Sequence, residues 1–310
     1  MEIINAASRI LKEKSVVTIG TFDGVHIGHQ KIIEKLVEAA KKEQLASTVL
    51  TFFPHPRMVL QKDANIKLIN TIEERSMLLE RLGLDKLFIK TFDQEFSRLS
   101  AEDFVKELLV EQLHAKKVII GYDHHFGRNR SANIEDLKTF GETYAFDVEE
   151  IPAQDIDEVA VSSTKIRKAL QKGDMATANA FLGYNFMLSG TVVKGKQLGS
   201  TIGFPTANIH IKETYKLVPK QGAYIVQAQI GNSLVYGMMN IGTNPTVDGS
   251  TESIEVHFFN FNESLYGKTL QVEILHRLRD EQKFDSVEVL KKQLEIDKNH
   301  SQTYLENHAG

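Results

Sequence analysis

The chain has 310 residues, of which 42% are hydrophobic and 25% charged, with a formal net charge of −4 and no cysteine. This length predicts two domains, and the charge provides no basic field for nucleic acid or an anionic membrane surface. The lack of cysteine excludes disulfides, thiolate catalysis and cysteine-held metal sites, and no apolar run approaches the roughly 20 residues of a membrane-spanning helix, so we expect a cytoplasmic protein.

Strand-like and helical patterns alternate from residue 16 to about residue 183. The predicted strands are 16–19, 47–53, 86–92, 117–122 and 146–151. The main predicted helices are 30–44, 72–82, 101–113, 165–171 and 175–181. Such alternation predicts a parallel sheet covered by helices on both faces, with ligands bound at the carboxyl ends of the strands.

The pattern changes near residue 184. Beta-rich runs separated by turn residues lie at 186–194, 223–230, 234–241, 253–259 and 270–278. Only the last segment, 286–305, is clearly helical. These runs predict an antiparallel barrel or sandwich with one C-terminal helix, and we place the domain boundary between 183 and 184, giving domains 1–183 and 184–310.

A glycine-rich turn joins the first strand to its helix. It reads IGTFDGVHIGH, and its glycines let the backbone come close to a ligand. The helix that follows offers free N–H groups and a partial positive charge, which suit a phosphate chain. His26 and His29 stand near this helix start and can reach one anionic group. The turn therefore predicts a nucleoside triphosphate site.

Two other interpretations of this turn exist. One is a purely structural turn with two surface histidines, because glycine-rich turns open many α/β units. The other is a metal site, in which His26 and His29 join Asp123, His124 and His125. The metal interpretation lacks the HExxH pattern that places a base beside the ligands.

The run GTFDGVHIGH resembles the HxGH motif of nucleotidyltransferases, in the form typical of bacterial flavin adenylyltransferases. A second motif of that superfamily should lie downstream, and VSSTKIR at 161–167 matches it. Ser163 or Thr164 can cap the helix that follows, and Arg167 adds a cation for phosphates.

The resemblance implies a role for each matching residue. His26 and His29 would bind the phosphates of ATP and stabilise charge as pyrophosphate leaves. Ser163, Thr164 and Arg167 would close on the β- and γ-phosphates. The remaining nucleotide-binding residues of the turn would be Gly20, Phe22, Asp23, Gly24 and Gly28. The phosphate of FMN would be the nucleophile, so catalysis requires positioning and electrostatic stabilisation but no protein base.

Two further segments resemble the flavin pocket of the same enzymes. Phe53 and Pro54 lie in the run FFPHP, similar to the F-x-P-H-P run that borders the flavin. The segment GYDHHFGR occupies the place of the family's G-x-[DN]-F-x-[FY]-G segment, where Asp123 and Phe126 match and His124 replaces a common phenylalanine. The resemblance implies flavin contacts for Phe53, Pro54, Asp123 and Phe126.

The second domain carries its own motif. The run GSTIGFPTAN at 199–208 resembles the riboflavin kinase motif G-x-P-T-A-N. Thr206 and Asn208 offer hard oxygen atoms two residues apart, which is compatible with Mg²⁺ bound together with phosphates. The nucleotide-binding residues implied here are Gly195, Gly199 and Thr201.

Three more matches to riboflavin kinases follow in the expected order. They are NIGTNPT, SIEVH and RLRDEQKF. Alternation places Glu255 opposite Ile254 and Val256, and a carboxylate facing the barrel interior is costly unless it is paired or functional. The resemblance makes Glu255 the general base that takes the proton of the riboflavin 5′-hydroxyl, and Arg279 and Phe284 part of a flavin cap.

The whole chain resembles the bacterial bifunctional riboflavin kinase/FAD synthetase family. The resemblance implies a Rossmann-like nucleotidyltransferase domain with a parallel sheet, then an antiparallel β-barrel kinase domain with a C-terminal helix. It implies riboflavin, FMN and ATP as substrates, Mg²⁺ as cofactor, FMN and FAD as products, and no nucleic-acid or membrane partner. A kinase with an inactive first domain and a flavin-sensing protein without turnover are the alternatives.

Overall fold

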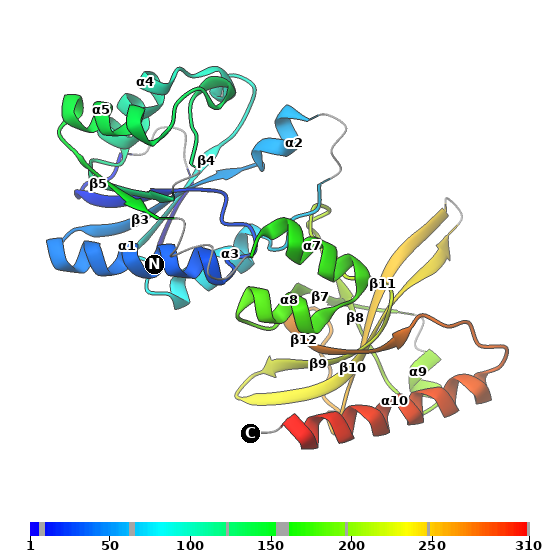
Figure 1. Ribbon diagram of the computed structural model, residues 1–310. Coiled ribbons are helices and arrows are strands. Elements are labelled where there is room, and N and C mark those ends of the chain that lie inside the picture. The colour runs from blue at the N-terminus through cyan, green and yellow to red at the C-terminus, as the bar shows by residue number, and fades with distance from the viewer. Residues whose placement is uncertain are drawn as a thin grey trace. The chain divides into compact units, whose positions relative to one another are not determined.

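The structure, a computed structural model, describes residues 1–5, 10–61, 66–121, 124–152, 161–195, 198–246 and 249–308. Residue contacts divide the chain into two compact units, Met1–Ser163 and Thr164–Gly310 (Figure 1). The domain boundary predicted at 183/184 stays a prediction. None of the helices in the described ranges is long and apolar enough to cross a membrane.

The first unit is built on a six-stranded sheet of order β1-β4-β3-β2-β5-β6, in which every neighbouring pair is parallel. The strands are β1 (Glu2–Asn5), β2 (Ser15–Ile19), β3 (Ala46–Phe53), β4 (Lys86–Thr91), β5 (Ala115–Gly121) and β6 (Asp147–Ile151). All five residues of β2 are buried because this strand lies inside the sheet and is covered on both faces. The predicted parallel sheet is confirmed, and β1 is an edge strand that the sequence analysis missed.

Helices cover both faces of this sheet (Figure 1). They are α1 (Ile27–Glu43), α2 (Pro56–Leu60), α3 (Ile72–Arg81), η1 (Phe96–Arg98), α4 (Ala101–Phe104), η2 (Val105–Gln112), η3 (Arg128–Arg130) and α5 (Ile134–Tyr144). Figure 1 shows α1 and α3 on one face and α4 and α5 on the other. A capping box between Thr71 and Glu74 begins α3.

The helix predicted at 101–113 changes its hydrogen-bond pattern part of the way along. It starts as α4, capped by Ser100, and continues as the π-helix η2. At its end the N–H of Leu113 donates to the carbonyl of Leu108, five residues back, at 2.9 Å. Apolar spacing locates the segment but does not reveal this wider turn.

The second unit is a closed antiparallel barrel of order β10-β11-β8-β7-β12-β9. Its strands are β7 (Met187–Val193), β8 (Ala207–His210), β9 (Gly222–Ile230), β10 (Ser233–Thr246), β11 (Gly249–Phe258) and β12 (Thr269–Asp280). Its helices are α7 (Ser163–Lys172), α8 (Met175–Leu182), α9 (Leu198–Thr201) and α10 (Val287–His308). The barrel and the C-terminal helix are confirmed, and β8 was not predicted.

Helix α10 packs along the barrel against β10 and β12 (Figure 1). Three rings hold its end: Tyr304 stacks on His276 of β12 at 4.8 Å between centroids and on His308 at 4.1 Å. Nearer the middle of the helix, Asp297 accepts hydrogen bonds from Arg279. The last helix is therefore tied to the strand that precedes it at two points.

Candidate active sites

The glycine-rich turn of the first unit leaves the carboxyl end of β2. In the sheet, β3 and β4 lie on one side of β2, whereas β5 lies on the other. The order in which successive strands are added to the sheet therefore reverses at β2. Open α/β sheets bind ligands at such a reversal. The predicted phosphate site thus stands where the topology favours one.

Asp23 anchors the turn. Its side chain is buried, with 1% exposed, and its carboxylate accepts hydrogen bonds from the backbone N–H groups of Ile69 and Asn70 at 3.0 and 3.3 Å. The hydroxyl of Ser163 donates to the backbone carbonyl of Asp23 at 2.8 Å. The SSTKIR segment thus contacts the turn at Ser163, and the phosphate contacts predicted for both stay predictions. Thr164 and Arg167 follow on α7.

His26 and His29 form a stacked pair at the start of α1. Their ring centroids are 3.6 Å apart with an interplanar angle of 15°, and the ring of Phe22 meets His29 edge-on at 5.1 Å. His26 is the N-cap of α1, and its Nδ1 accepts the N–H of His29 at 3.3 Å. Since Nδ1 is an acceptor, the neutral ring carries its proton on Nε2, which is a donor for an anion.

Both imidazoles are neutral near pH 7. Burial lowers the pKa of His26 to about 4, although the Asp23 carboxylate opposes the shift. Burial also lowers the pKa of His29 well below its usual value, and the charges of His26 and Arg75 lower it further. A cation at the N-terminus of α1 would also oppose the helix dipole. As neutral rings, the pair has N–H groups that can donate hydrogen bonds to an anion.

The other predicted residues of the first unit differ in their surroundings. Phe53 and Pro54 are half-buried at the end of β3, joined by a cis peptide bond. Phe126 is only 5% exposed, because it packs among core residues such as Phe104, 5.6 Å away. Asp123 lies outside the described residues. Flavin contacts of these four residues stay predictions.

Sequence reasoning missed Arg75. This residue of α3 is 1% exposed, and its guanidinium lies 3.7 Å from the Asp23 carboxylate. Leu78 and Leu79, three and four positions along the helix, are buried on the same face. A charged residue within such an apolar stripe is the sequence signal that could have found it.

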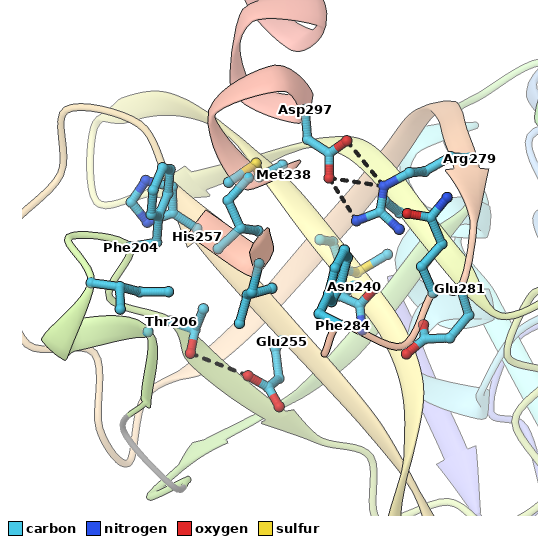
Figure 2. A pocket seen from close by; sticks show the side chains of 17 residues that line it. Phe204, Thr206, Met238, Asn240, Glu255, His257, Arg279, Glu281, Phe284 and Asp297 are labelled. Carbon is cyan, nitrogen blue, oxygen red and sulfur yellow. Dashed lines mark hydrogen bonds and ion pairs between the residues drawn. The ribbon is translucent and has the colours of Figure 1, made fainter. Parts of the chain in front are cut away.

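The second unit contains a cavity of about 240 Å³ between the barrel wall and α10 (Figure 2). Its apolar lining includes Phe204, Met238, Phe284, Leu290 and Leu294. Its polar lining includes Thr206, Asn240, Glu255, Glu281 and Arg279. An apolar cavity with a few polar groups has the composition of a small-molecule site.

Glu255 lies in the wall of this cavity. Ile254 and Val256 beside it are buried, whereas Glu255 is half-buried and exposed to the cavity, so the expectation that it faces the barrel interior was wrong. The hydroxyl of Thr206 donates to its carboxylate at 3.4 Å (Figure 2), and Asn208 is its partner across the β8–β11 pair. Thr206 therefore contacts Glu255, and Asn208 lies opposite Glu255 on the neighbouring strand; the predicted roles of the three residues stay predictions.

The glycine-rich segment comes close to this group. A Cβ at Gly195 would collide with the side chain of Asn208, so only glycine lets the backbone pass here. Gly199 lines the cavity, and Thr201 follows at the end of α9. Their predicted nucleotide contacts stay predictions.

A second carboxyl, Glu281, lies in the same cavity. Burial raises the pKa of Glu281, and the negative charge of Glu255 raises it further, although a hydrogen bond from Asn240 and the charge of Arg279 oppose the shift. Glu281 belongs to the predicted RLRDEQKF motif, yet no role was assigned to it.

Arg279 links the cavity wall to α10. Its guanidinium donates to both carboxylate oxygens of Asp297 at 2.7–3.0 Å (Figure 2). Gln293 donates to the same carboxylate at 2.9 Å. Its Cζ also lies 5.8 Å from the ring centroid of Phe284. Arg279 thus joins β12 to α10, and the flavin contacts predicted for Arg279 and Phe284 stay predictions.

The metal interpretation of the two histidines finds no support in the described residues, because no group of three or more His, Asp or Glu side chains there is arranged to hold a metal ion.

Comparisons with known proteins match both units. A family model described as FAD synthetase matches residues 8–165, and one described as riboflavin kinase matches residues 182–305. Bifunctional riboflavin kinase/FMN adenylyltransferases of Listeria monocytogenes and Escherichia coli are each 36% identical to this chain, covering 94% and 95% of it and 92% and 94% of their own lengths. A crystal structure described as a macrolide-efflux protein from Streptococcus pneumoniae is 34% identical, with a TM-score of 0.84 over 96% of this chain and 95% of that one.

The buried histidines make the first unit less stable in acid. Since the pKa of His26 is depressed in the folded state, the unfolded state binds the proton more readily, and stability falls as the pH drops from about 6.5 towards 4. His26→Asn keeps an N-cap acceptor but cannot titrate. Between pH 7 and 5 we therefore expect its free energy of unfolding to fall by about 2 kcal/mol less than that of the parent. Calorimetric unfolding of the first unit at both pH values measures this, and equal losses would contradict it.

The Arg279–Asp297 pair should control the attachment of α10. Asp297→Asn leaves a partly buried guanidinium without its counter-ion, at a cost of about 2 kcal/mol. We expect amide hydrogen exchange in α10 to accelerate by roughly 30-fold if local opening governs it. Glu295→Gln removes a charge from an exposed position of the same helix and should leave exchange unchanged. Equal exchange in both variants would refute this role of the ion pair.

Proposed function

This chain belongs to the bifunctional riboflavin kinase/FMN adenylyltransferase family, and we propose that each of its two units holds one active site. The protein phosphorylates riboflavin with ATP to FMN. It then adenylylates FMN with a second ATP to give FAD and pyrophosphate. One observation carries the proposal. The histidine pair lies in the first unit, within residues 8–165 that match the FAD synthetase model. Glu255 lies in the second unit, within residues 182–305 that match the riboflavin kinase model.

In the kinase site, Glu255 acts as the general base. It takes the proton of the riboflavin 5′-hydroxyl while the 5′-oxygen bonds to the γ-phosphorus of ATP. The bond from that phosphorus to the bridging oxygen breaks, and ADP leaves. The half-buried position of Glu255 in the cavity wall and its contact with Thr206 support this assignment.

We propose Mg²⁺ as the cofactor of this site. Thr206 and Asn208 supply oxygen ligands beside Glu255, and an oxygen donor set is the kind that Mg²⁺ prefers. When bound, the ion neutralises charge on the phosphates of ATP. Gly195, Gly199 and Thr201 would lie against the nucleotide, and Phe284 would cover the flavin ring.

In the adenylyl-transfer site, an oxygen of the FMN phosphate attacks the α-phosphorus of ATP. The bond between the α-phosphorus and the bridging oxygen breaks, and pyrophosphate leaves. The neutral rings of His26 and His29 donate hydrogen bonds to the phosphates, and the N-terminus of α1 adds a partial positive charge. Ser163, Thr164 and Arg167 would bind the β- and γ-phosphates, and Phe53 and Pro54 the flavin. We further propose a cytoplasmic location.

Two variants test the division of labour. Glu255→Gln lacks the base and should lower FMN formation from riboflavin by about 10²–10⁴-fold, while FAD formation from added FMN continues. His29→Ala should do the reverse, so that riboflavin accumulates as FMN. Rates of both steps in each full-length variant give the answer. Loss of both activities in either variant would refute independent sites.

Removal of divalent cations tests the cofactor. With excess EDTA we expect FMN formation to stop, and added Mg²⁺ should restore it. Thr206→Val deletes one oxygen ligand and should raise the Mg²⁺ concentration needed for the half-maximal rate, whereas Thr191→Val, at an exposed position of β7, should not. An unchanged Mg²⁺ requirement in Thr206→Val would remove this residue from the ligand set.

A further inference from the structure

Arg75 is a buried cation close to the adenylyl-transfer site. It lies in the first turn of α3, directly after Glu74 of the capping box, and is only 1% exposed. Arginine is almost never fully buried unless it is paired, because desolvation of its charge is costly. Its position therefore calls for an explanation in terms of what it contacts.

The guanidinium of Arg75 contacts the turn that carries the histidines and the neighbouring strand β3. Its Nη2 lies 3.7 Å from Oδ1 of Asp23, in the turn after β2. Its Nη1 donates to the hydroxyl of Thr51 on β3 at 3.4 Å, and that hydroxyl donates to the carbonyl of Thr21 at 3.3 Å. One side chain thus links the turn at Thr21 and at Asp23.

The turn needs such support, because its backbone conformation is strained. Phe22 and Val25 have positive φ angles of 47° and 35°, which side-chain-bearing residues rarely adopt. Phe22 packs edge-on against His29, and Val25 directly precedes His26, the N-cap of α1. If the turn relaxed, both histidines would move.

We propose that Arg75 is a positioning residue for adenylyl transfer, which holds Asp23 and Thr51 and thereby fixes the turn that presents His26 and His29 to the phosphates. This inference rests on the adenylyl-transfer site proposed above. Arg75 acts through the turn and is not assigned a contact with the substrate.

The charges around the histidines support this role. His29 faces His26 on its own segment and Arg75 on α3, and both lower the pKa of His29 beyond the effect of burial. His26 faces Asp23, which raises its pKa. The ion pair of Asp23 and Arg75 therefore places a negative charge near one ring and a positive charge near the other. Arg75 helps to keep His29 neutral as pH falls.

The experiment compares four full-length variants: Arg75→Met, Arg75→Lys, Arg81→Met and His29→Ala. Each is assayed for FAD formation from FMN and for FMN formation from riboflavin. The kinase reaction in the same preparation shows that the second unit is intact, and circular dichroism with calorimetry reports the folding of the first. Arg81 lies on α3 at an exposed position, so Arg81→Met controls for loss of a charge from that helix.

We expect Arg75→Met to lower kcat of FAD formation at least 10-fold with a smaller change in KM for ATP, and to leave FMN formation unchanged. Arg75→Lys should recover most of the rate, and Arg81→Met should match the parent. The acid limb of the pH–rate profile should move to higher pH in Arg75→Met, because a cation near His29 has gone. NMR titration of the histidines should show the same shift without turnover.

Three outcomes would overturn the inference: normal FAD formation in Arg75→Met, an equal defect in Arg81→Met, or an unshifted histidine titration in a folded Arg75→Met. If Arg75→Met does not fold, a normal rate and pH profile in Arg75→Asn or Arg75→Gln counts against it. Full FAD formation in His29→Ala would instead refute the proposed site itself, so the two failures can be told apart.

Discussion

A carboxylate removed from water must find hydrogen-bond donors, and in the first unit this requirement falls on Asp23. Backbone N–H groups of Ile69 and Asn70 and the guanidinium of Arg75 surround it. These donors come from the segment between β3 and β4, so the turn after β2 is held by a part of the chain some 46 residues away. The geometry of the two histidines follows from this attachment, because the same turn leads into α1.

The two sites use opposite electrostatic arrangements. In the first unit, burial lowers the pKa of two histidines, so neutral rings stand beside the N-terminus of α1 and its free N–H groups. In the barrel, two carboxyl groups share a cavity, and the raised pKa of Glu281 follows in part from the charge of Glu255. Phosphate binding needs donors, whereas deprotonation of a hydroxyl needs an acceptor, so the two arrangements agree with the proposed division of the two reactions.

Long buried strands and motif order were predictable from the sequence, because β-branched runs such as 16–19 are typical of buried strands. The short strands β1 and β8 were missed, since four residues carry little pattern and their pairing is decided by tertiary contacts. Helix α5 was not identified although Asn133 and Asp136 form a capping box. The side of the barrel wall that Glu255 faces was beyond reach, because it depends on which face of the strand the fold covers. Arg75 was missed although it interrupts an apolar stripe of α3.

The ring stack of His276, Tyr304 and His308 has a practical consequence for spectroscopy. The chain has eight tyrosines and no tryptophan, so its intrinsic ultraviolet emission comes from tyrosine without the usual dominant indole signal. Tyr304 joins α10 to β12 between two imidazoles, and its environment changes if the helix leaves the barrel. The molecule thus carries an optical reporter of whether the helix that lines the barrel cavity is in place, and no label has to be introduced.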